Sequence, residues 1–365
     1  MAGTSYKAAV FTGPGNPFEL QTFEAPEHLA PGSALCRIRL STICGSDLHT
    51  MAGRRQEPAP AILGHETAGE LIALGPGPLR DASGAELSVG DRVTWDIVVS
   101  CGECFYCKRD LPQKCTSLLK YGHMSCQDAP HLTGGYAQAV VLLPGTAIFR
   151  VPDQIPDTLA APANCVTATA CNAMEAVGLL LGETVLIQGA GMLGLNLIAL
   201  AKEAGASCVV VTDGNELRLD LARAFGADLT VDVRTTSDEE AVGLIREASG
   251  GFGVDAAIEV CGVASALNVG MQALRMGGRY VIAGMVVPGV ELPVQAHEVL
   301  RRCLTIRGIH NYRPEHLGQA LEFLERFGER YPYGELVGAE FALREINEAM
   351  KVAASGRFVR VGVAP

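Results

Sequence analysis

Hydrophobic and polar positions follow two different patterns in the earlier and the later parts of the chain. Between residues 5 and 150, short apolar and β-branched runs alternate with Gly/Pro turns, and helical periodicity is scarce. The pattern predicts strands at 7–11, 34–40, 68–74, 92–95 and 136–143. We therefore expect this part of the chain to form a mostly β domain.

From about residue 165 onward, strands alternate with helices of about a dozen residues. Strands are predicted at 184–188, 208–213, 229–233, 254–260 and 279–283, and helices at 192–204, 216–225, 239–249 and 265–276. This alternation is typical of a parallel, doubly wound sheet with helices on both faces. The expected fold class is therefore α/β.

Beyond residue 305 the chain returns to helices, predicted at 314–327 and 343–355, and ends in a strand at 358–363. No repeat, low-complexity segment or long polar linker interrupts it. We expect the parallel-sheet domain (165–305) to be inserted into a mostly β domain made of residues 1–164 and 306–365.

Composition excludes several classes of partner. The chain has 365 residues, of which 48% are hydrophobic and 19% charged, and its net charge is −11. Without a basic run, it has no surface suited to nucleic acid or anionic lipid. The N-terminal residues lack the pattern of a secretory signal, and the most apolar tract (173–204) is interrupted by Glu175, Glu183 and Gln188. We expect a soluble, cytoplasmic protein.

Four cysteines lie close together with the spacing of a metal site. Cys101, Cys104, Cys107 and Cys115 follow the pattern C-x2-C-x2-C-x7-C. Four thiolates at one point suit the tetrahedral preference of Zn²⁺ in a structural site. Disulfides are the alternative, but the other eight of the 12 cysteines are scattered, and nothing at the N-terminus indicates secretion. The pattern predicts a structural zinc lobe at 98–118.

A glycine motif directly follows the predicted strand at 184–188. Gly189, Gly191 and Gly194, with Met192 and Leu193 between the last two, form G-x-G-x-x-G at the start of a predicted helix. In this context the glycines permit a tight turn, a close approach of a pyrophosphate and close helix–strand packing. The helix N-terminus then offers free N–H groups to the phosphates. The alternative is a glycine-rich turn that binds nothing.

Asp213 ends the following strand, where an acid pairs with the adenosine ribose hydroxyls. A carboxylate there repels a 2′-phosphate, so the position favours NAD over NADP. Because Arg218 follows one helical turn further on, NADP remains the alternative cofactor.

Two clusters and one later cysteine contain further zinc ligands. They are Cys44 with Ser46, Asp47 and His49; His65 with Glu66; and Cys165. Two thiolates and an imidazole would leave a fourth position open, which is typical of a catalytic zinc. The alternative is that these cysteines and the histidine are ordinary core residues.

These motifs together resemble the zinc-dependent medium-chain dehydrogenase/reductase family, which includes alcohol and sorbitol dehydrogenases. The four-cysteine lobe, G-H-E, C-x-S-D-x-x-H and G-x-G-x-x-G occur in the family's order over nearly the whole chain. The resemblance implies a GroES-like catalytic domain with an inserted Rossmann domain. This chain has Cys165 where the sorbitol-type branch often has a glutamate ligand.

The resemblance also implies a role for each matching residue: catalytic zinc ligands Cys44, His65 and Cys165; an acid beside the metal, Glu66; an orienting carboxylate, Asp47; a proton relay, Ser46 and His49; a nicotinamide contact, Thr169; and a pyrophosphate contact, Arg360. It implies two zinc ions per chain, NAD as cofactor and a homodimer or homotetramer. The expected reaction is hydride transfer between an alcohol and NAD, with zinc as Lewis acid. Rivals are a zinc-free quinone or enoyl reductase and a non-catalytic NAD sensor that retains only the structural zinc.

The substrate is the least constrained expectation. Residues 111–123 and 161–165 are similar to a branch described as phosphonate-catabolism-associated alcohol dehydrogenases. A dianionic phosphonate would need cations near the zinc; the candidates are Arg54, Arg55, Lys120 and His123. Any one of them taken singly is more simply an ordinary surface charge. The alternative substrate is a secondary alcohol or polyol with no phosphonate.

Overall fold

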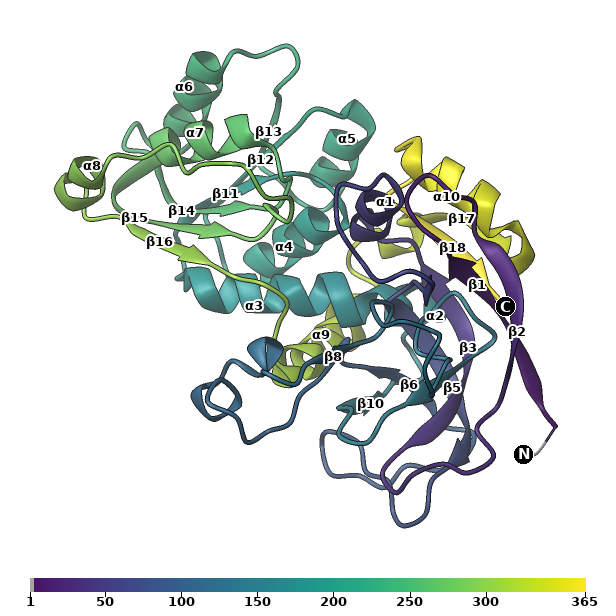
Figure 1. Ribbon diagram of the computed structural model, residues 1–365. Coiled ribbons are helices and arrows are strands. Elements are labelled where there is room, and N and C mark those ends of the chain that lie inside the picture. The colour runs from purple at the N-terminus through teal and green to yellow at the C-terminus, as the bar shows by residue number, and fades with distance from the viewer. Residues whose placement is uncertain (1–2) are drawn as a thin grey trace. The chain divides into compact units, whose positions relative to one another are not determined.

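The computed structural model describes residues 3–365 (Figure 1). These residues form two compact units, each with its own hydrophobic core. The first contains the described residues up to Ala168, together with Arg313–Glu329 and Tyr333–Pro365; the second contains Thr169–Tyr312 and Arg330–Pro332. The division falls at 168/169 and 312/313, whereas the sequence pattern predicts 164/165 and 305/306. The short segment Arg330–Pro332 in the second unit was not expected.

The first unit is built around a sheet with the strand order β10-β6-β5-β3-β18-β17, in which β9 also pairs with β3. A smaller sheet has the order β2-β1-β4, and β7 pairs with β8. The strands are β1 Ser5–Phe11, β2 Glu19–Glu24, β3 Ala34–Thr42, β4 Ala61–Ile62, β5 Glu66–Leu74, β6 Arg92–Trp95, β7 Val98–Val99, β8 Leu119–Lys120, β9 Ala139–Leu142, β10 Ile148–Arg150, β17 Val337–Ala342 and β18 Arg360–Ala364. A core that includes Leu35, Trp95 and Tyr121 fills this unit.

Helices of the first unit carry or support the candidate site residues. They are α1 Gly45–Met51, α2 Asp157–Pro162, the π-helical turn η3 Ala163–Thr167, α9 Pro314–Phe327 and α10 Ile346–Ala354. The strand β18, drawn in yellow in Figure 1, pairs antiparallel with β3, which itself pairs with β5. In these ladders Thr42 lies opposite both Gly362 and Glu66. The C-terminal strand is thereby separated from the beginning of β5 by β3 alone.

The second unit is a six-stranded parallel sheet with the order β13-β12-β11-β14-β15-β16. Its strands are β11 Thr184–Gln188, β12 Cys208–Asp213, β13 Leu229–Asp232, β14 Val254–Glu259, β15 Leu274–Ile282 and β16 Thr305–Gly308; its helices are α3 Ala168–Val177, α4 Met192–Glu203, α5 Glu216–Ala224, α6 Asp238–Ala248, α7 Ala264–Ala273 and α8 Ala296–Arg301. The order reverses between β11 and β14, and such a switch point is where open α/β sheets bind ligands. The doubly wound α/β fold is confirmed.

Two predicted element boundaries were wrong. The helix predicted at 265–276 ends at Ala273, because Leu274 is extended and pairs with Val254 at the start of β15. The strand predicted at 136–143 begins only at Ala139; Tyr136 instead donates its N–H to the carbonyl of Leu63. Along residues 3–365, no helix is long and apolar enough to cross a bilayer.

Candidate active site

The four lobe cysteines converge on one point. Their sulfurs all lie within 4.8 Å of one another, with 3.4 Å between Cys115 and Cys101 and 3.5 Å between Cys104 and Cys107. A tetrahedral zinc site with Zn–S bonds of about 2.3 Å has S···S edges of about 3.8 Å. Backbone N–H groups of Cys107 and Thr116 donate to the sulfur of Cys104 and lower its pKa to about 5. The pKa of Cys115 is lowered as well, whereas burial raises that of Cys107 to about 11. The convergence of the four sulfurs fits the structural zinc site.

The second group of potential ligands consists of Cys44, His65, Glu66 and Cys165, whose ligand atoms also lie within 4.8 Å of one another. Cys44 caps the N-terminus of α1, and His65 immediately precedes β5. Cys165 lies on the π-helical turn η3, an irregularity that often marks functional sites. Hydrogen bonds from Cys165 and His65 lower the pKa of Cys44. Two thiols, one imidazole and an adjacent carboxylate fit the catalytic zinc site.

Asp47 supports two of these ligands at once. Its Oδ1 lies 3.5 Å from Nδ1 of His65, and its Oδ2 accepts a hydrogen bond of 3.0 Å from the backbone N–H of Cys44. Both Asp47 and His65 are buried. Because Nδ1 faces Asp47, Nε2 is the ring nitrogen left to bind a metal. This geometry agrees with the orienting role expected of Asp47.

Glu66 is held by two partners that the sequence did not reveal. Arg360 pairs with both of its oxygens, at 2.9 Å and 3.0 Å, and the hydroxyl of Thr42 donates to Oε2 at 2.6 Å. The guanidinium of Arg360 also lies 3.9 Å from the sulfur of Cys44. Burial raises the pKa of Glu66 to about 7, although the charge of Arg360 opposes this shift. Arg360, which the resemblance places at the pyrophosphate, thus contacts Glu66 and Cys44. Its contact with the pyrophosphate stays a prediction.

The two residues of the predicted relay both lie on α1. The hydroxyl of Ser46 is 3.5 Å from Nε2 of His65, on the metal-facing side of the ring. His49 is partly buried, and within residues 3–365 its Nδ1 has no hydrogen-bond partner. Burial lowers its pKa, and the charges of Arg54 and Arg55 lower it further. A neutral imidazole at this point can accept a proton at neutral pH.

The glycine motif lies where the strand order reverses, at the carboxyl end of β11. Gly189 has φ +112°, and a side chain there would meet Cys261. A Cβ on Gly194 would lie 1.8 Å from the carbonyl oxygen of Gly189, whereas a Cβ on Gly191 would meet nothing within 4 Å. The open space beside Gly191, at the uncapped start of α4, fits a pyrophosphate. Met192 and Leu193 form the first turn of that helix.

Asp213 and Arg218 line a cavity of about 240 Å³ next to this loop. The carboxylate of Asp213 accepts N–H groups of Ala190 at 2.7 Å and Asn215 at 2.8 Å. Nε of Arg218 is buried with no hydrogen-bond partner in the described part of the chain. The carboxylate is therefore fixed by the backbone and keeps acceptor capacity for ribose hydroxyls. Thr169 belongs to the second unit, and its nicotinamide contact stays a prediction.

Sequence reasoning missed three buried or half-buried ionisable residues of the first unit. Tyr136 donates its hydroxyl to Asp47 at 2.8 Å, and Glu57 lies between Arg55 and His123. Asp96 is buried, and burial raises its pKa to about 7. Only Tyr136 had a signal, the Gly134-Gly135 pair before it, which lets the backbone pass close to residues 62–64. Of the four candidate cations, Arg54 is exposed, whereas Arg55, Lys120 and His123 are partly buried.

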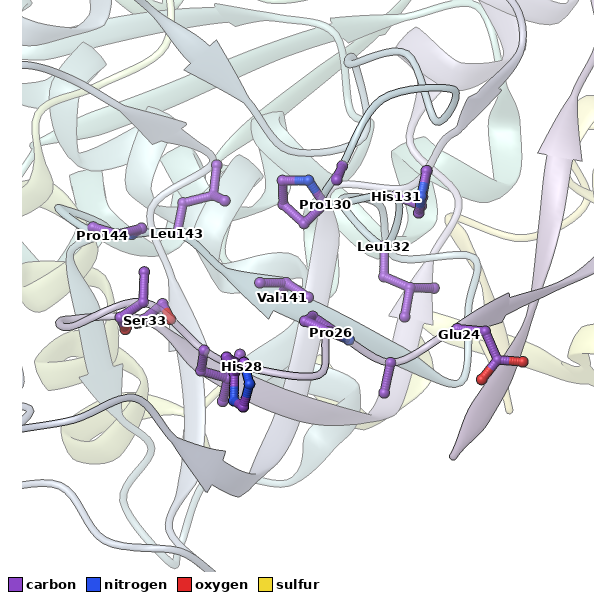
Figure 2. A pocket seen from close by; sticks show the side chains of 14 residues that line it. Glu24, Pro26, His28, Ser33, Pro130, His131, Leu132, Val141, Leu143 and Pro144 are labelled. Carbon is purple, nitrogen blue, oxygen red and sulfur yellow. Dashed lines mark hydrogen bonds between the residues drawn. The ribbon is translucent and has the colours of Figure 1, made fainter. Parts of the chain in front are cut away.

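A separate apolar cavity of about 490 Å³ lies on the first unit (Figure 2). Pro26, Leu132 and Val141 line it, with His28 and His131 among the polar residues. None of the candidate ligands or relay residues lines it, so the chemistry lies elsewhere.

Comparisons with known proteins agree with this geometry. The model of the alcohol dehydrogenase GroES-like domain matches residues 30–153, and that of the zinc-binding dehydrogenase matches residues 193–326. The 5-exo-hydroxycamphor dehydrogenase of Pseudomonas putida is 30% identical over 346 residues, 93% of this chain and 94% of that protein. The L-threonine 3-dehydrogenase of Pyrococcus horikoshii is 34% identical over 312 residues, 83% of this chain and 82% of that protein.

A solved structure extends the agreement to the whole chain. The alcohol dehydrogenase of Thermotoga maritima matches with a TM-score of 0.93 and 34% identity, covering 100% of both chains. The same family is indicated by the two domain models, by the relatives that match most of the chain and by the two groups of candidate zinc ligands. The chain belongs to the zinc-dependent medium-chain alcohol dehydrogenase family and is an enzyme of the NAD-dependent alcohol dehydrogenase type.

Proposed function

We propose that this NAD-dependent alcohol dehydrogenase interconverts an alcohol that bears a phosphonate with its aldehyde or ketone. The observation that carries the proposal is the side chain of Lys120. Its ammonium makes no hydrogen bond or ion pair with any of residues 3–365, although it lies close enough to Cys44 and Cys165 to interact with their charge. A partly buried cation left without a partner beside the metal ligands is suited to an anion on the substrate.

The surroundings of Lys120 add to this support. Burial lowers its pKa, as does the nearby charge of Arg55, while Cys165 and Glu57 raise it. Arg55 is itself half-buried and pairs with Glu57 at 2.8 Å. A dianionic phosphonate would strengthen the charged form of Lys120, and the guanidinium of Arg55 would offer a fork for two of its oxygens.

The residues of the first unit have distinct tasks in this reaction. Zinc held by Cys44, His65 and Cys165 would supply a Lewis acid that polarises the carbon–oxygen bond. Asp47 keeps His65 in its tautomer and orientation. Ser46 would accept the proton that the alcohol loses, and His49, neutral at pH 7, would carry it toward solvent.

A secondary alcohol or polyol without an anion is the second candidate substrate. The relative from Pseudomonas putida is named for a hydroxycamphor, a substrate without a charged group. The relative from Pyrococcus horikoshii is named for L-threonine, whose carboxylate is an anion other than phosphonate. Lys120 could form an ion pair with a carboxylate as well as with a phosphonate. The test must therefore distinguish these two anions.

The test is NADH formation by zinc-loaded enzyme with 2-hydroxyethylphosphonate, 1-hydroxyalkylphosphonates, matched hydroxycarboxylates and the plain alcohols. We expect kcat/KM for a phosphonate to exceed that of its plain analogue by at least about tenfold. Lys120→Met should abolish this advantage and Lys120→Arg should keep most of it. Equal turnover of phosphonate and plain alcohol would overturn the phosphonate proposal.

We also propose that the enzyme is a homodimer or homotetramer that associates through the edge of the second unit's sheet. The strand β16 ends that sheet, and its outer edge has no partner strand within residues 3–365. Leu300, just before it, is 74% exposed. An edge of this kind is a template for pairing with a second copy. Light scattering of wild type and Thr305→Pro tests the idea; a wild-type monomer would refute it.

NAD as the preferred dinucleotide and a cytoplasmic location complete the proposal. The first is supported by Asp213, whose carboxylate is fixed in the nucleotide cavity. The cytoplasmic location is supported by the candidate zinc ligands, because six of the eight are thiols. Thiols stay reduced, and so able to bind zinc, in a reducing compartment.

A further inference from the structure

Glu259 ends the strand β14 with a side chain that is completely buried. Its Oε1 accepts the backbone N–H groups of Cys261 at 2.8 Å and Gly262 at 2.6 Å. Its Oε2 accepts that of Gly284 at 3.1 Å, a donor shared with the backbone carbonyl of Glu259 itself. Cys261 and Gly262 follow β14, and Gly284 follows β15. One carboxylate therefore holds the turns at the carboxyl ends of two neighbouring strands.

Both turns pack tightly around this carboxylate. A Cβ on Gly284 would lie 2.6 Å from Oε1 of Glu259, and a Cβ on Gly262 would lie 2.8 Å from the carbonyl oxygen of Gly284. Gly262 also has φ +71°, which a residue with a side chain rarely adopts. Cys261 and Gly262 are themselves exposed, so the buried carboxylate is bonded directly to a turn at the surface.

The carboxylate of Glu259 has no counter-ion in the described part of the chain. All three of its partners are N–H donors, so it serves as an acceptor-only group. Among residues 3–365, no Lys, Arg or His side chain pairs with it. Hydrogen bonds from neutral N–H groups stabilise an anion but do not cancel its charge. A buried anion of this kind attracts a cation that binds nearby.

The strand order indicates which half of a dinucleotide binds closest to Glu259. Asp213 ends β12, the glycine loop follows β11, and Glu259 ends β14, opposite Gln188 of β11. A Cβ on Gly189 would lie 2.9 Å from that of Cys261, so the turn held by Glu259 packs against the glycine loop. Each half of such a sheet binds one mononucleotide. With the adenosine ribose at β12, the nicotinamide half falls to β14 and β15.

We propose that Glu259 is a specificity-determining residue of the dinucleotide site, whose charge tightens the binding of the oxidised cofactor relative to the reduced one. The nicotinamide ring carries one positive charge when oxidised and none when reduced, whereas the adenosine and the two phosphates are the same in both forms. An anion on the nicotinamide side of the site therefore discriminates between them. The proposal requires that a nicotinamide dinucleotide binds at the glycine motif, and it holds for any alcohol substrate.

Glu259→Gln separates the charge from the hydrogen bonds. The amide oxygen of glutamine can still accept the N–H groups of Cys261 and Gly262, so the turn after β14 should keep its place. Only the side-chain bond to Gly284 is lost, and that N–H keeps the backbone carbonyl of residue 259 as its acceptor. A loss of structural support would weaken the oxidised and the reduced cofactor alike. A loss of charge would weaken the oxidised cofactor alone.

The experiment is calorimetric titration of the zinc-loaded enzyme with NAD, NADH and ADP-ribose, without any alcohol. We expect Glu259→Gln to raise the ratio of the Kd for NAD to the Kd for NADH at least about fivefold. The Kd for ADP-ribose, which lacks the nicotinamide, should stay within about twofold of wild type. Glu247→Gln, which removes an exposed acid from α6 in the same unit, is the matched control and should leave the ratio unchanged. An unchanged ratio in Glu259→Gln, or an equal loss of affinity for NAD and NADH, would overturn the proposal.

A second comparison uses the wild type alone and applies even if thermal melts show that Glu259→Gln does not fold. Benzamide adenine dinucleotide has a planar aromatic ring like that of NAD but lacks its positive charge. The wild type should bind NAD at least about fivefold more tightly than this analogue. Equal affinities would overturn the proposal. Failure of phosphonates as substrates would leave both results untouched, because no alcohol is present in either titration.

Discussion

The hydroxyl of Tyr136 donates a hydrogen bond of 2.8 Å to Oδ2 of Asp47, and both side chains are buried. The same oxygen holds the backbone N–H of Cys44, while the other oxygen of Asp47 faces His65. One phenol thus stabilises a carboxylate that supports two metal ligands. Outer partners of this kind commonly change metal affinity by about 10- to 100-fold.

Tyr136→Phe removes only this hydroxyl, so it should speed the release of the catalytic zinc. We expect an increase of about tenfold in the release rate to a colorimetric chelator, with the lobe zinc released as in wild type. Tyr280→Phe is the control, because it deletes a buried hydroxyl that bonds to Gln188 in the second unit. Identical release from wild type and Tyr136→Phe would show that Asp47 needs no support from the phenol.

The glycine motif offers two substitutions to alanine with opposite consequences. Gly191→Ala places a methyl group in open space, so stability should fall by about 1 kcal/mol or less, while NAD affinity falls strongly. Gly194→Ala drives a Cβ into the carbonyl of Gly189 and should destabilise the second unit by several kcal/mol, about 3 or more. Denaturation curves and NADH titrations distinguish the two. Normal NADH binding by Gly191→Ala would remove that glycine from the cofactor site.

Asp213 should set the preference between the two dinucleotides. Asp213→Ala removes the carboxylate that repels a 2′-phosphate, and Arg218 remains in the cavity to attract one. We expect the ratio of kcat/KM for NAD to that for NADP to fall at least about tenfold. Asp220→Ala, on the exposed face of α5, is the control. An unchanged ratio would place the discrimination outside this cavity.

The relay predicts a specific pH dependence. Because the pKa of His49 is lowered from its usual 6.5, the imidazole is neutral at pH 7 and becomes charged only on further acidification. Alcohol oxidation should therefore lose activity as pH falls below that lowered pKa. His49→Ala should be slower near neutral pH and partly rescued by added imidazole. Equal rates for both proteins across the pH range would remove His49 from the mechanism.

Replacing one ligand in each site should remove one zinc ion at a time and so distinguish the two sites. Cys104→Ser should lose the lobe zinc, and Cys165→Ser the catalytic one, each leaving about one ion of two per chain. Cys165→Ser should lose activity while its lobe stays folded; Cys104→Ser should unfold more easily. Atomic absorption and thermal melts give both readouts. One zinc in the wild type would point to a non-catalytic protein.

Sequence reasoning succeeded where the chemistry is local in the chain. Cys101 to Cys115 and Gly189 to Gly194 are short segments whose spacing alone fixes their geometry. The alternation of apolar strands and amphipathic helices likewise predicted the parallel sheet. These features depend on neighbours a few residues away, which a sequence displays directly.

It failed where the fold joins distant segments. Arg360 and Glu66 are 294 residues apart, and their pairing follows from β18 lying beside β3. Glu57 and His123 meet because two loops converge, and neither loop has a periodic pattern. Leu274 was assigned to a helix because its apolar character suits either structure, and only pairing with Val254 decides for the strand.

The pairing of Arg360 with Glu66 also has a consequence for synthesis on the ribosome. A nascent chain that has emerged only through the parallel sheet already contains Cys44, His65 and Cys165, but Glu66 lacks its counter-ion. A fully buried carboxylate without a partner opposes closure of the surrounding protein. Glu66 therefore gains its counter-ion only when β18 pairs with β3, so the surroundings of the candidate metal ligands are complete only once residues 360–364 are in place.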